Sequence, residues 1–377
     1  MRFDVRGLLC RGATVVSLGL VLAACVGTPK PKPTLLEPLT PQVSGRQVWK
    51  HSFGDVKFPL AVAVNGGTFT VADDDGTVMA LEAETGREQW RTRVGDKLSA
   101  GVGSDGRFAS VVTRDNELVT LDAGKLLWRQ QLPSRVVTAP LVAGERVFVL
   151  AVDRTVSAFD ALDGRKLWSY QRPSDALTLA SPGVLVPFKD TLVVGQGPKM
   201  AGLDPLRGTL RWEATVASPR GTNEVERLAD LVGPSARVGE VICARSFQSA
   251  VACVNAERGS TVWTRNAGGT AGVGADAQVV VGADASDRIT AWRTTDGTVA
   301  WTGDKLLYRE LTAPLGVGKS FVMGDIEGMV HWFSGDSGTP VLRLPTDGTP
   351  IQVAPVASGL TLLIVTRNGG LFAFRPE

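Results

Sequence analysis

The sequence predicts an all-β protein, an eight-bladed β-propeller of four-stranded antiparallel blades. A unit of about 42 residues recurs eight times along the chain, and this length fits four short strands with their turns. The composition agrees, since 43 Gly and only 21% charged residues suit short strands joined by glycine turns. One closed repeat array therefore accounts for a body that length alone would divide into two or three domains.

The repeat is clearest in residues 76–90, where an Ala-Leu pair precedes Thr85-Gly86 and then Trp90. The seventh copy has Leu342 in place of the Trp, and the eighth stops half-way, at Phe374. The copies in between end at Trp128, Trp168, Trp212, Trp263 and Trp301. Because these Trp residues recur at one repeat position, we assign them to the core between blades and not to a ligand-binding rim.

Each strand of a unit has its own sequence signal. We expect strand A to start at an Ala-Pro pair such as Ala139-Pro140, strand B to be an apolar run such as residues 146–152, and strand C to carry the Ala-Leu pair. Strand D is expected to end in Trp. Between C and D the Gly supplies the left-handed backbone of a tight hairpin. One sheet cannot bury its own faces, so Trp and Leu must pack between neighbouring blades, at about 1.5–3 kcal/mol for each buried side chain.

The two ends of the chain are expected to share a blade. The eighth copy lacks strand D, and Gly45 to Trp49 reads as a D strand without a blade. Pairing the two closes the ring and leaves no open sheet edge. The propeller should therefore comprise residues 44–377.

The N-terminus reads as a lipoprotein signal. Residues 1–24 contain three Arg followed by an apolar run that is shorter than the roughly 20 residues of a membrane helix. The run ends in Leu-Ala-Ala-Cys25, which resembles the lipobox of bacterial lipoproteins and implies acylation of Cys25. The alternative is an ordinary cleavage site with an incidental Cys. Val26, where inner-membrane lipoproteins carry Asp, implies the outer membrane, and the Pro-rich residues 25–43 are expected to form an extended tether.

A family resemblance adds to this. The pattern from Ala80 to Trp90 resembles the repeat of quinoprotein dehydrogenases, which also builds the BamB family, the lipoprotein subunit of the bacterial outer-membrane β-barrel assembly machinery. Residues 221–230, in the longest gap between Trp residues, are similar to that family's Gly-Ser-Thr-Glu-Ile-(Asp/Glu)-Arg-Leu-x-Asp segment. Repeat symmetry does not explain this second match, so it points to BamB in particular.

The resemblance implies a partner surface. In the family, a Leu-x-Leu-Arg loop and an Asp-x-Asp pair dock on the periplasmic domains of BamA, the barrel-forming subunit. Leu177, Leu179 and Asp230 match these motifs, whereas Ala180 and Val232 replace the Arg and the second acid. The alternative is that both Leu side chains are inter-blade core. Exposed on a rim, the pair would suit a partner anchor, and unfolded outer-membrane proteins are a further possible partner.

No residue pattern requires a catalyst, a metal or a cofactor. Asp336-Ser337 echoes a protease motif but falls on a C-to-D turn, and the Asp residues at 73–75, 284 and 287 fall on B-to-C turns. The glycine-rich residues 268–274 are assigned to an inner strand and not to a phosphate cradle. A formal net charge of +2 provides no footprint for nucleic acid.

The two remaining cysteines belong to one blade. A three-residue B-to-C loop would place Cys243 directly opposite Cys253. In an oxidising periplasm the pair could form a disulfide, with two buried thiols as the alternative.

These observations predict a non-enzymatic scaffold at the periplasmic face of the outer membrane. Two other functions remain as alternatives, a quinoprotein-type oxidoreductase and a propeller that binds a ligand at its rim. Against the first, the quinoprotein enzymes use adjacent cysteines, whereas Cys243 and Cys253 are separated in the sequence.

Overall fold

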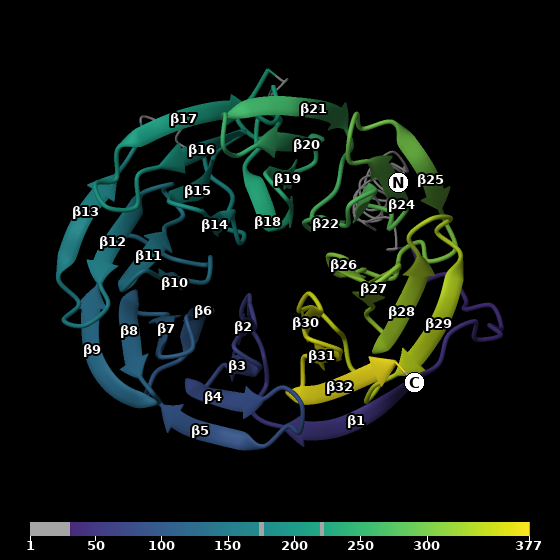
Figure 1. Ribbon diagram of the computed structural model, residues 1–377, viewed down its shortest axis with the longest axis horizontal. Helices are drawn as coiled ribbons and strands as arrows, with labels where there is room; N and C mark the ends of the chain where they lie inside the picture. Colours follow the sequence, from purple (N-terminus) through teal and green to yellow (C-terminus); the bar gives the residue numbers. More distant parts are fainter. Residues whose placement is uncertain (1–30, 173–176, 219–221, 377) are drawn as a thin grey trace, which may run out of the picture. The chain divides into compact units, whose positions relative to one another are not determined.

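The computed structural model describes residues 31–172, 177–218 and 222–376, and its larger compact unit is Thr34–Glu377. Within this unit eight separate four-stranded antiparallel sheets surround a central axis, as Figure 1 shows. The eight-bladed propeller is therefore confirmed. The described residues contain no helix long and apolar enough to span a bilayer, and the predicted signal peptide and Cys25 lie outside them.

Each blade runs from an innermost strand A to an outermost strand D (Figure 1). Blades 1 to 4 consist of β2 (Ala63–Asn65), β3 (Thr68–Ala72), β4 (Thr77–Glu82) and β5 (Glu88–Arg93); β6 (Leu98–Ser104), β7 (Phe108–Thr113), β8 (Glu117–Asp122) and β9 (Lys125–Gln131); β10 (Leu141–Ala143), β11 (Arg146–Leu150), β12 (Val156–Asp160) and β13 (Lys166–Tyr170); and β14 (Leu185–Phe188), β15 (Thr191–Gln196), β16 (Lys199–Leu203) and β17 (Leu210–Thr215).

Blades 5 to 8 follow the same order. They consist of β18 (Leu231–Val238), β19 (Val241–Ser246), β20 (Ala250–Asn255) and β21 (Ser260–Asn266); β22 (Gly274–Ala275), β23 (Val279–Ala283), β24 (Ile289–Arg293) and β25 (Val299–Gly303); β26 (Leu315–Val317), β27 (Ser320–Gly324), β28 (Met329–Ser334) and β29 (Pro340–Pro345); and β30 (Val356–Ser358), β31 (Thr361–Val365), β32 (Gly370–Pro376) and β1 (Gly45–Ser52).

Blade 8 joins the two ends of the chain. Strand β1 pairs antiparallel with β32, with Gly45 opposite Pro376 and Trp49 opposite Ala373. This confirms the predicted closure, although the strand continues past Trp49 to Ser52. The other D strands that carry a Trp also continue beyond it, as β5 does from Trp90 to Arg93, so the expectation that strand D ends at the Trp is wrong. Strand A begins just after the Ala-Pro pairs, as in β10.

In every blade except blade 7, strand D carries a Trp that packs on the C-to-D turn of the next blade. Trp263 of blade 5 is buried, and its indole Nε1 donates to the carbonyl of Thr294 in blade 6 at 2.9 Å. A Cβ added to Gly297 of the same turn would lie 2.6 Å from the indole ring. Glycine is therefore needed at position 297 for two reasons. Its φ of 71° is unfavourable for other residues, and a side chain would collide with the Trp263 ring. The seven Trp/Gly pairs are Trp49/Gly86, Trp90/Gly124, Trp128/Gly164, Trp168/Gly208, Trp212/Gly259, Trp263/Gly297 and Trp301/Gly338.

The eighth junction explains why the seventh repeat has Leu342. Blade 8 takes its strands C and D from opposite ends of the chain, so no C-to-D turn exists on which a Trp could pack. Leu342 instead lies 3.1 Å from the Cβ position of Gly45 and joins a buried cluster with Phe372 and Phe374. The departure from the repeat follows from closing the ring with β1.

Residues 34–43, the last part of the predicted tether, lie along blade 7. The Thr34 amide donates to Leu307 O at 3.0 Å, and the Gln42 amide donates to Val341 O at 2.8 Å. Leu36 packs on the core cluster of blades 6 and 7. The buried Arg309 donates through Nη1 to the Thr34 carbonyl at 2.7 Å. The part of the predicted tether next to the propeller is therefore a strap on its side.

Candidate functional site: the long-connection face

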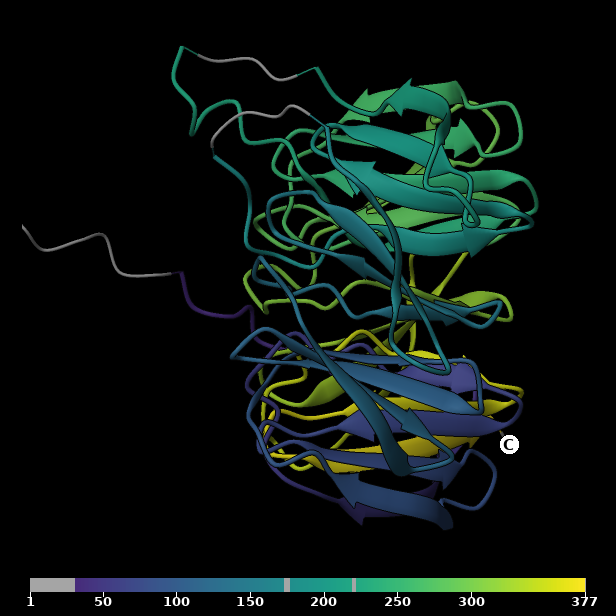
Figure 2. The ribbon, with the colours of Figure 1, turned by 90° about the vertical axis from the view of Figure 1, so that its left-hand side faces the viewer.

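The propeller has two unlike faces. In an antiparallel blade the B-to-C turns and the connections from D to the next A emerge on one face, which we call the long-connection face; it includes residues 177–184 and 222–230. The A-to-B and C-to-D turns emerge on the other, the short-turn face, which includes residues 144–145 and 204–209. In Figure 2 the long connections project at the left. The residues expected to bind a partner all lie on the long-connection face.

The structure brings Leu179 and Asp230 together from two different connections. Asp230 Oδ2 accepts a hydrogen bond from the Leu179 amide at 3.3 Å, and its Oδ1 accepts one from Arg154 Nε at 2.8 Å. The side chains of Arg154 and Asp230 are only 12% and 13% exposed. Arg154 comes from the B-to-C turn of blade 3, so this ion pair links blades 3, 4 and 5.

This geometry changes the role expected of Asp230. Its carboxylate is occupied within the chain, so Asp230 holds the Leu179 backbone in place and does not present a free charge. Leu177 and Leu179 are both half-buried, and neither belongs to the inter-blade clusters formed by the described residues. The next residue, Ala180, is exposed, whereas Val232 is buried at the start of β18. The surface is therefore apolar and firmly supported.

A second apolar position lies on the neighbouring connection. Val225 is 70% exposed at the tip of the turn formed by residues 222–228. The turn is braced reciprocally: the Glu226 amide donates to Asn223 Oδ1 at 2.9 Å, and Glu226 Oε2 accepts from the Thr222 amide at 2.8 Å. The Thr222 amide lowers the pKa of Glu226, so this brace is charged at neutral pH.

Two of these residues were not anticipated from the sequence. Arg154 lies on an ordinary B-to-C turn, and only the fold brings it to Asp230. Val225 lay inside the segment that the family resemblance singled out, and its position between two braced polar residues was a usable signal. The Asn-x-x-Glu spacing of residues 223–226 is typical of a capped turn, which would expose the Val between them.

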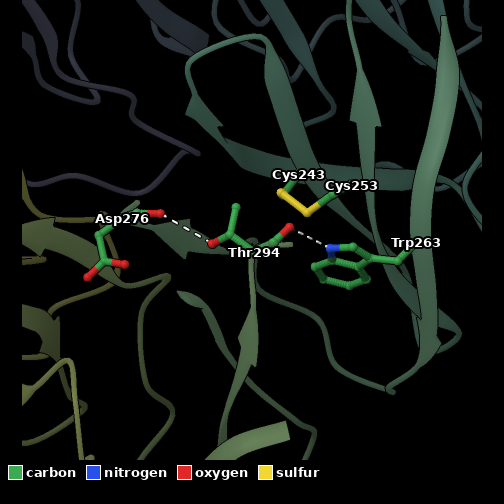
Figure 3. Close-up of a disulfide and its surroundings, with 5 residues drawn as sticks. All are labelled: Cys243, Cys253, Trp263, Asp276 and Thr294. Atoms are coloured by element: carbon green, nitrogen blue, oxygen red, sulfur yellow. Dashed lines mark hydrogen bonds between the residues drawn. A yellow bond between two sulfur atoms is a disulfide. The ribbon is translucent and has the colours of Figure 1, made fainter. Parts of the chain in front are cut away.

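The cysteines lie in the interior between blades 5 and 6. Cys243 is opposite Cys253 in the register of β19 and β20, and the two form a disulfide with a Cα–Cα distance of 4.0 Å. Figure 3 shows the disulfide beside Trp263, whose indole bonds to Thr294. Both sulfurs are fully buried. The disulfide therefore acts as a structural cross-link and is not presented to a substrate.

The other chemistry-bearing motifs occupy structural positions. Ser337 lies on the C-to-D turn of blade 7, where its hydroxyl donates to Thr339 Oγ1 at 2.9 Å. Asp73 caps its own hairpin by accepting from the Thr77 amide at 2.8 Å. Asp284 does the same for the Arg288 amide at 3.0 Å. Across the described part of the chain, no three or more His, Cys, Asp or Glu side chains form a group that could hold a metal.

The glycine-rich residues 268–274 surround a buried arginine. Arg245 of β19 is fully buried, and its Nη1 donates to the carbonyls of Ala267, at 3.1 Å, and Gly268. Burial lowers the pKa of Arg245 to about 10, which still leaves it charged at neutral pH. A Cβ on Gly269 or Gly282 would lie 2.5 Å from its guanidinium nitrogens. These glycines leave room for the arginine, and only Gly274 of the stretch lies in the inner strand β22.

Comparison with known proteins identifies relatives over nearly the whole chain. The family model described as "Outer membrane protein assembly factor BamB" matches residues 39–98 and 74–303. A protein of that name from Burkholderia pseudomallei is 35% identical, over 95% of this chain and 96% of its own length. Another from Bordetella pertussis is 33% identical over the full length of both chains.

Solved structures agree on the fold. The crystal structure of BamB from Moraxella catarrhalis matches with a TM-score of 0.79 at 23% identity, over 88% of this chain and 100% of that one. A quinohemoprotein alcohol dehydrogenase from Pseudomonas putida matches with a TM-score of 0.67 at 12% identity, over 88% and 76%. At these identities both structures support the propeller fold alone.

Proposed function

Because the chain belongs to the BamB family of outer membrane protein assembly factors, we propose that it is a non-enzymatic scaffold of the machinery that assembles outer-membrane β-barrels. The observation that carries the proposal is the apolar, internally braced surface around Leu177 and Leu179. A surface held in place before binding loses little conformational entropy when a partner docks. This suits a protein that presents a surface to other proteins.

The partner we propose is BamA, the barrel-forming subunit, through its periplasmic domains. Leu177, Leu179 and Val225 would supply apolar contacts, while Arg154 and Asp230 would hold the two connections in register. Apolar anchors on a supported surface are typical of residues that dominate binding energy. Segments of unfolded outer-membrane proteins are a second class of partner for the same face.

The chain is proposed to be anchored at the periplasmic face of the outer membrane by acylated Cys25. Support comes from the lipobox-like Leu-Ala-Ala-Cys25 and from Val26. One acyl chain binds a membrane weakly, so stable anchoring needs more than one. Residues 26–377 fused to an ordinary cleavable signal peptide, which removes Cys25, should move from the outer-membrane fraction to the soluble periplasmic fraction. Retention of this variant in the outer-membrane fraction after depletion of BamA would contradict acyl anchoring.

The docking surface is tested by pull-down from detergent-solubilised envelope. A tagged mature chain carrying Leu177→Glu and Leu179→Glu should recover at least tenfold less BamA than the wild type, because two carboxylates would be desolvated in the contact. Leu360→Glu, an exposed leucine on the A-to-B turn of blade 8 and so on the short-turn face, is the matched control. Circular dichroism must match the wild type. Undiminished recovery by the folded double variant would refute this surface.

The oxidoreductase alternative rests on the shared fold alone. The quinoprotein enzymes carry a disulfide between adjacent cysteines, whereas Cys243 and Cys253 form a buried cross-strand pair. Those enzymes also hold calcium with carboxylate and amide side chains, and among the described residues no three or more His, Cys, Asp or Glu side chains form a group that could hold a metal. The described residues therefore do not fit a quinone site of that kind. Quinone-dependent dye reduction by the purified chain, with no recovery of BamA, would favour the alternative.

A further inference from the structure

The short-turn face carries a groove between blades 3 and 4. The A-to-B turns of both blades and the C-to-D turn of blade 4 enclose a space of about 170 Å³. Buried Phe148 and Leu192 form its base, and Pro187, Pro205 and Leu206 line its opening. An apolar cavity of about 150 Å³ holds a benzene-sized group. The groove therefore has room for one aromatic or large aliphatic side chain.

Leu206 departs from the repeat at the edge of this groove. It occupies the third position of a C-to-D turn whose hydrogen-bonding pattern is the same in six blades. At this position only blades 3 and 4 have an apolar residue, Leu162 and Leu206, which are 50% and 60% exposed. The other four have Glu84, Glu257, Thr295 and Asp336. Exposed leucines where the repeat has polar residues are not required by the fold.

Arg146 is a second departure, at the same groove. It begins β11, and its side chain lies on the same side of the strand as Phe148, toward blade 4. In the strand register Arg146 pairs with Asp160, the first residue of the C-to-D turn. In five other blades the strand B residue paired at this position is uncharged: Thr68, Phe108, Val241, Val279 and Ser320. The groove thus combines an apolar lining with a cation that the repeat does not explain.

No acidic side chain among the described residues compensates the charge of Arg146. Its Nη1 donates to the carbonyl of Gly144 in its own turn at 2.9 Å, whereas its Nε is buried without a hydrogen-bond partner. It makes no ion pair within the described ranges. Lys189, the other cation of the lining, is paired with Glu257 at 2.5 Å. A guanidinium without an acidic partner favours a carboxylate, because a hydrogen bond between two charged groups is stronger than one between neutral groups.

We propose that this groove binds an extended segment of a partner protein in which an aromatic or large aliphatic residue stands beside an acidic one. The apolar side chain would enter between Phe148 and Leu206, and the neighbouring carboxylate would pair with Arg146. The volume accommodates one such side chain, and the charge favours an acid beside it. Because the groove is on the face opposite Leu179, the scaffold could hold such a segment while its long-connection face is occupied.

The test uses the mature chain in detergent micelles with labelled leucine methyl groups. The probe is the end-blocked peptide Gly-Ser-Phe-Asp-Ser-Gly, compared with versions that have Asn for Asp or Ser for Phe. We expect saturable shifts of the methyl groups of Leu141, Leu192 and Leu206 with the first peptide. The Asn version should bind about tenfold more weakly, as expected for the loss of a charge-assisted hydrogen bond, and the Ser version should not bind.

Variants separate the two parts of the site. Arg146→Met should weaken the Asp peptide about tenfold, to the level of the Asn peptide, and Leu206→Glu should abolish binding. Leu360→Glu, a 73% exposed leucine on the A-to-B turn of blade 8, is the matched control and should bind as the wild type does.

Three outcomes would overturn the proposal. They are equal binding of the Asp and Asn peptides, absence of methyl shifts up to the solubility limit of the peptide, and shifts of the same methyl groups on dilution without peptide. The last would mean that a second copy of the chain occupies the groove. The groove proposal rests on the proposed scaffold function, and recovery of BamA by Leu206→Glu tests that function separately. Failure of the peptide to bind would therefore leave docking on BamA testable, and failure of docking on BamA would leave the groove testable.

Discussion

The junction between blades 5 and 6 and the junction between blades 7 and 8 solve one packing problem with different side chains. At the first, Trp263 covers Gly297, bonds to Thr294 and lies beside a disulfide. At the second, Leu342 packs on the closing strand. The difference teaches that the Trp of the repeat serves the C-to-D turn of the next blade. Where that turn is missing, the Trp is missing too.

Blade 7, on the closing side, has a buried polar cluster instead. Arg309 Nε and His331 Nε2 both bond to Asp325 Oδ2, at 2.7 and 2.8 Å, and all three side chains are nearly inaccessible to solvent. Arg309 also reaches the strap at Thr34, and Arg343 donates to the Glu37 carbonyl at 3.0 Å. Polar contacts with residues 34–43 therefore support the part of the ring next to the closure.

The largest effect is expected from removing the Trp itself. Trp263→Ala should lower the free energy of unfolding by about 3–5 kcal/mol, because it empties a buried site and leaves Thr294 O unpaired. Leu342→Ala should cost about 2 kcal/mol, at the lower end for a buried leucine, because no hydrogen bond is lost. Urea denaturation followed by circular dichroism measures both. If Leu342→Ala costs as much as Trp263→Ala, the two junctions are equivalent and the comparison fails.

The turn glycine should come next. Gly297→Ala must accommodate both a left-handed backbone and a clash with the Trp263 ring, so we expect a loss of about 3 kcal/mol. Gly318→Ala is the matched control, since Gly318 has a φ of 60° and nothing within 4 Å of its Cβ position. That variant should lose only about 1 kcal/mol. Equal losses would mean that backbone conformation alone explains the glycine.

The disulfide should contribute a somewhat smaller amount. Replacing Cys243 and Cys253 together by Ala should lower the free energy of unfolding by about 2–3 kcal/mol, because the cross-link closes only a short loop in the unfolded chain. The control is wild-type protein unfolded and refolded in reductant, which lacks the cross-link but keeps both Cys side chains. A double variant as stable as the oxidised wild type would show that the cross-link is dispensable at this junction.

The smallest effect concerns pH at blade 7. Burial lowers the pKa of His331 below its usual range, although Asp325 favours the protonated ring. Burial opposes ionisation of Asp325, yet hydrogen bonds from His331 and Arg309 hold the pKa of Asp325 below its usual range. Between pH 7 and 5 Asp325 therefore stays ionised, and His331 is the group of this pair that responds to acid.

The sign of that response is destabilising. Below about pH 6.5 the unfolded chain gains a proton at His331 that the folded chain resists, so stability is lost as pH falls, by at most about 1.4 kcal/mol per pH unit. His331→Gln should flatten this loss, as measured by urea denaturation between pH 7 and 5. The same change at His51, the other histidine, is the control. A variant with the wild-type slope would contradict the assignment.

The candidate site was predictable only in part. Leu179 and Asp230 could be named because motifs of a known family mark them, and the structure does place them in contact. Arg154 could not, since an arginine on a B-to-C turn carries no signal until the fold brings it to an acid 76 residues away. The internal role of Asp230 depends on that same contact.

The sequence by itself determined the blade count, the strand order and the closure by β1. The alternation of apolar and polar residues, the turn residues and the repeat length are local properties, and they recur in each copy of the repeat. Only the tertiary structure decided which Trp covers which Gly, why Leu342 replaces one, and where residues 34–43 lie. Those contacts join residues of different blades, and the free energy they contribute exists only once the ring is closed.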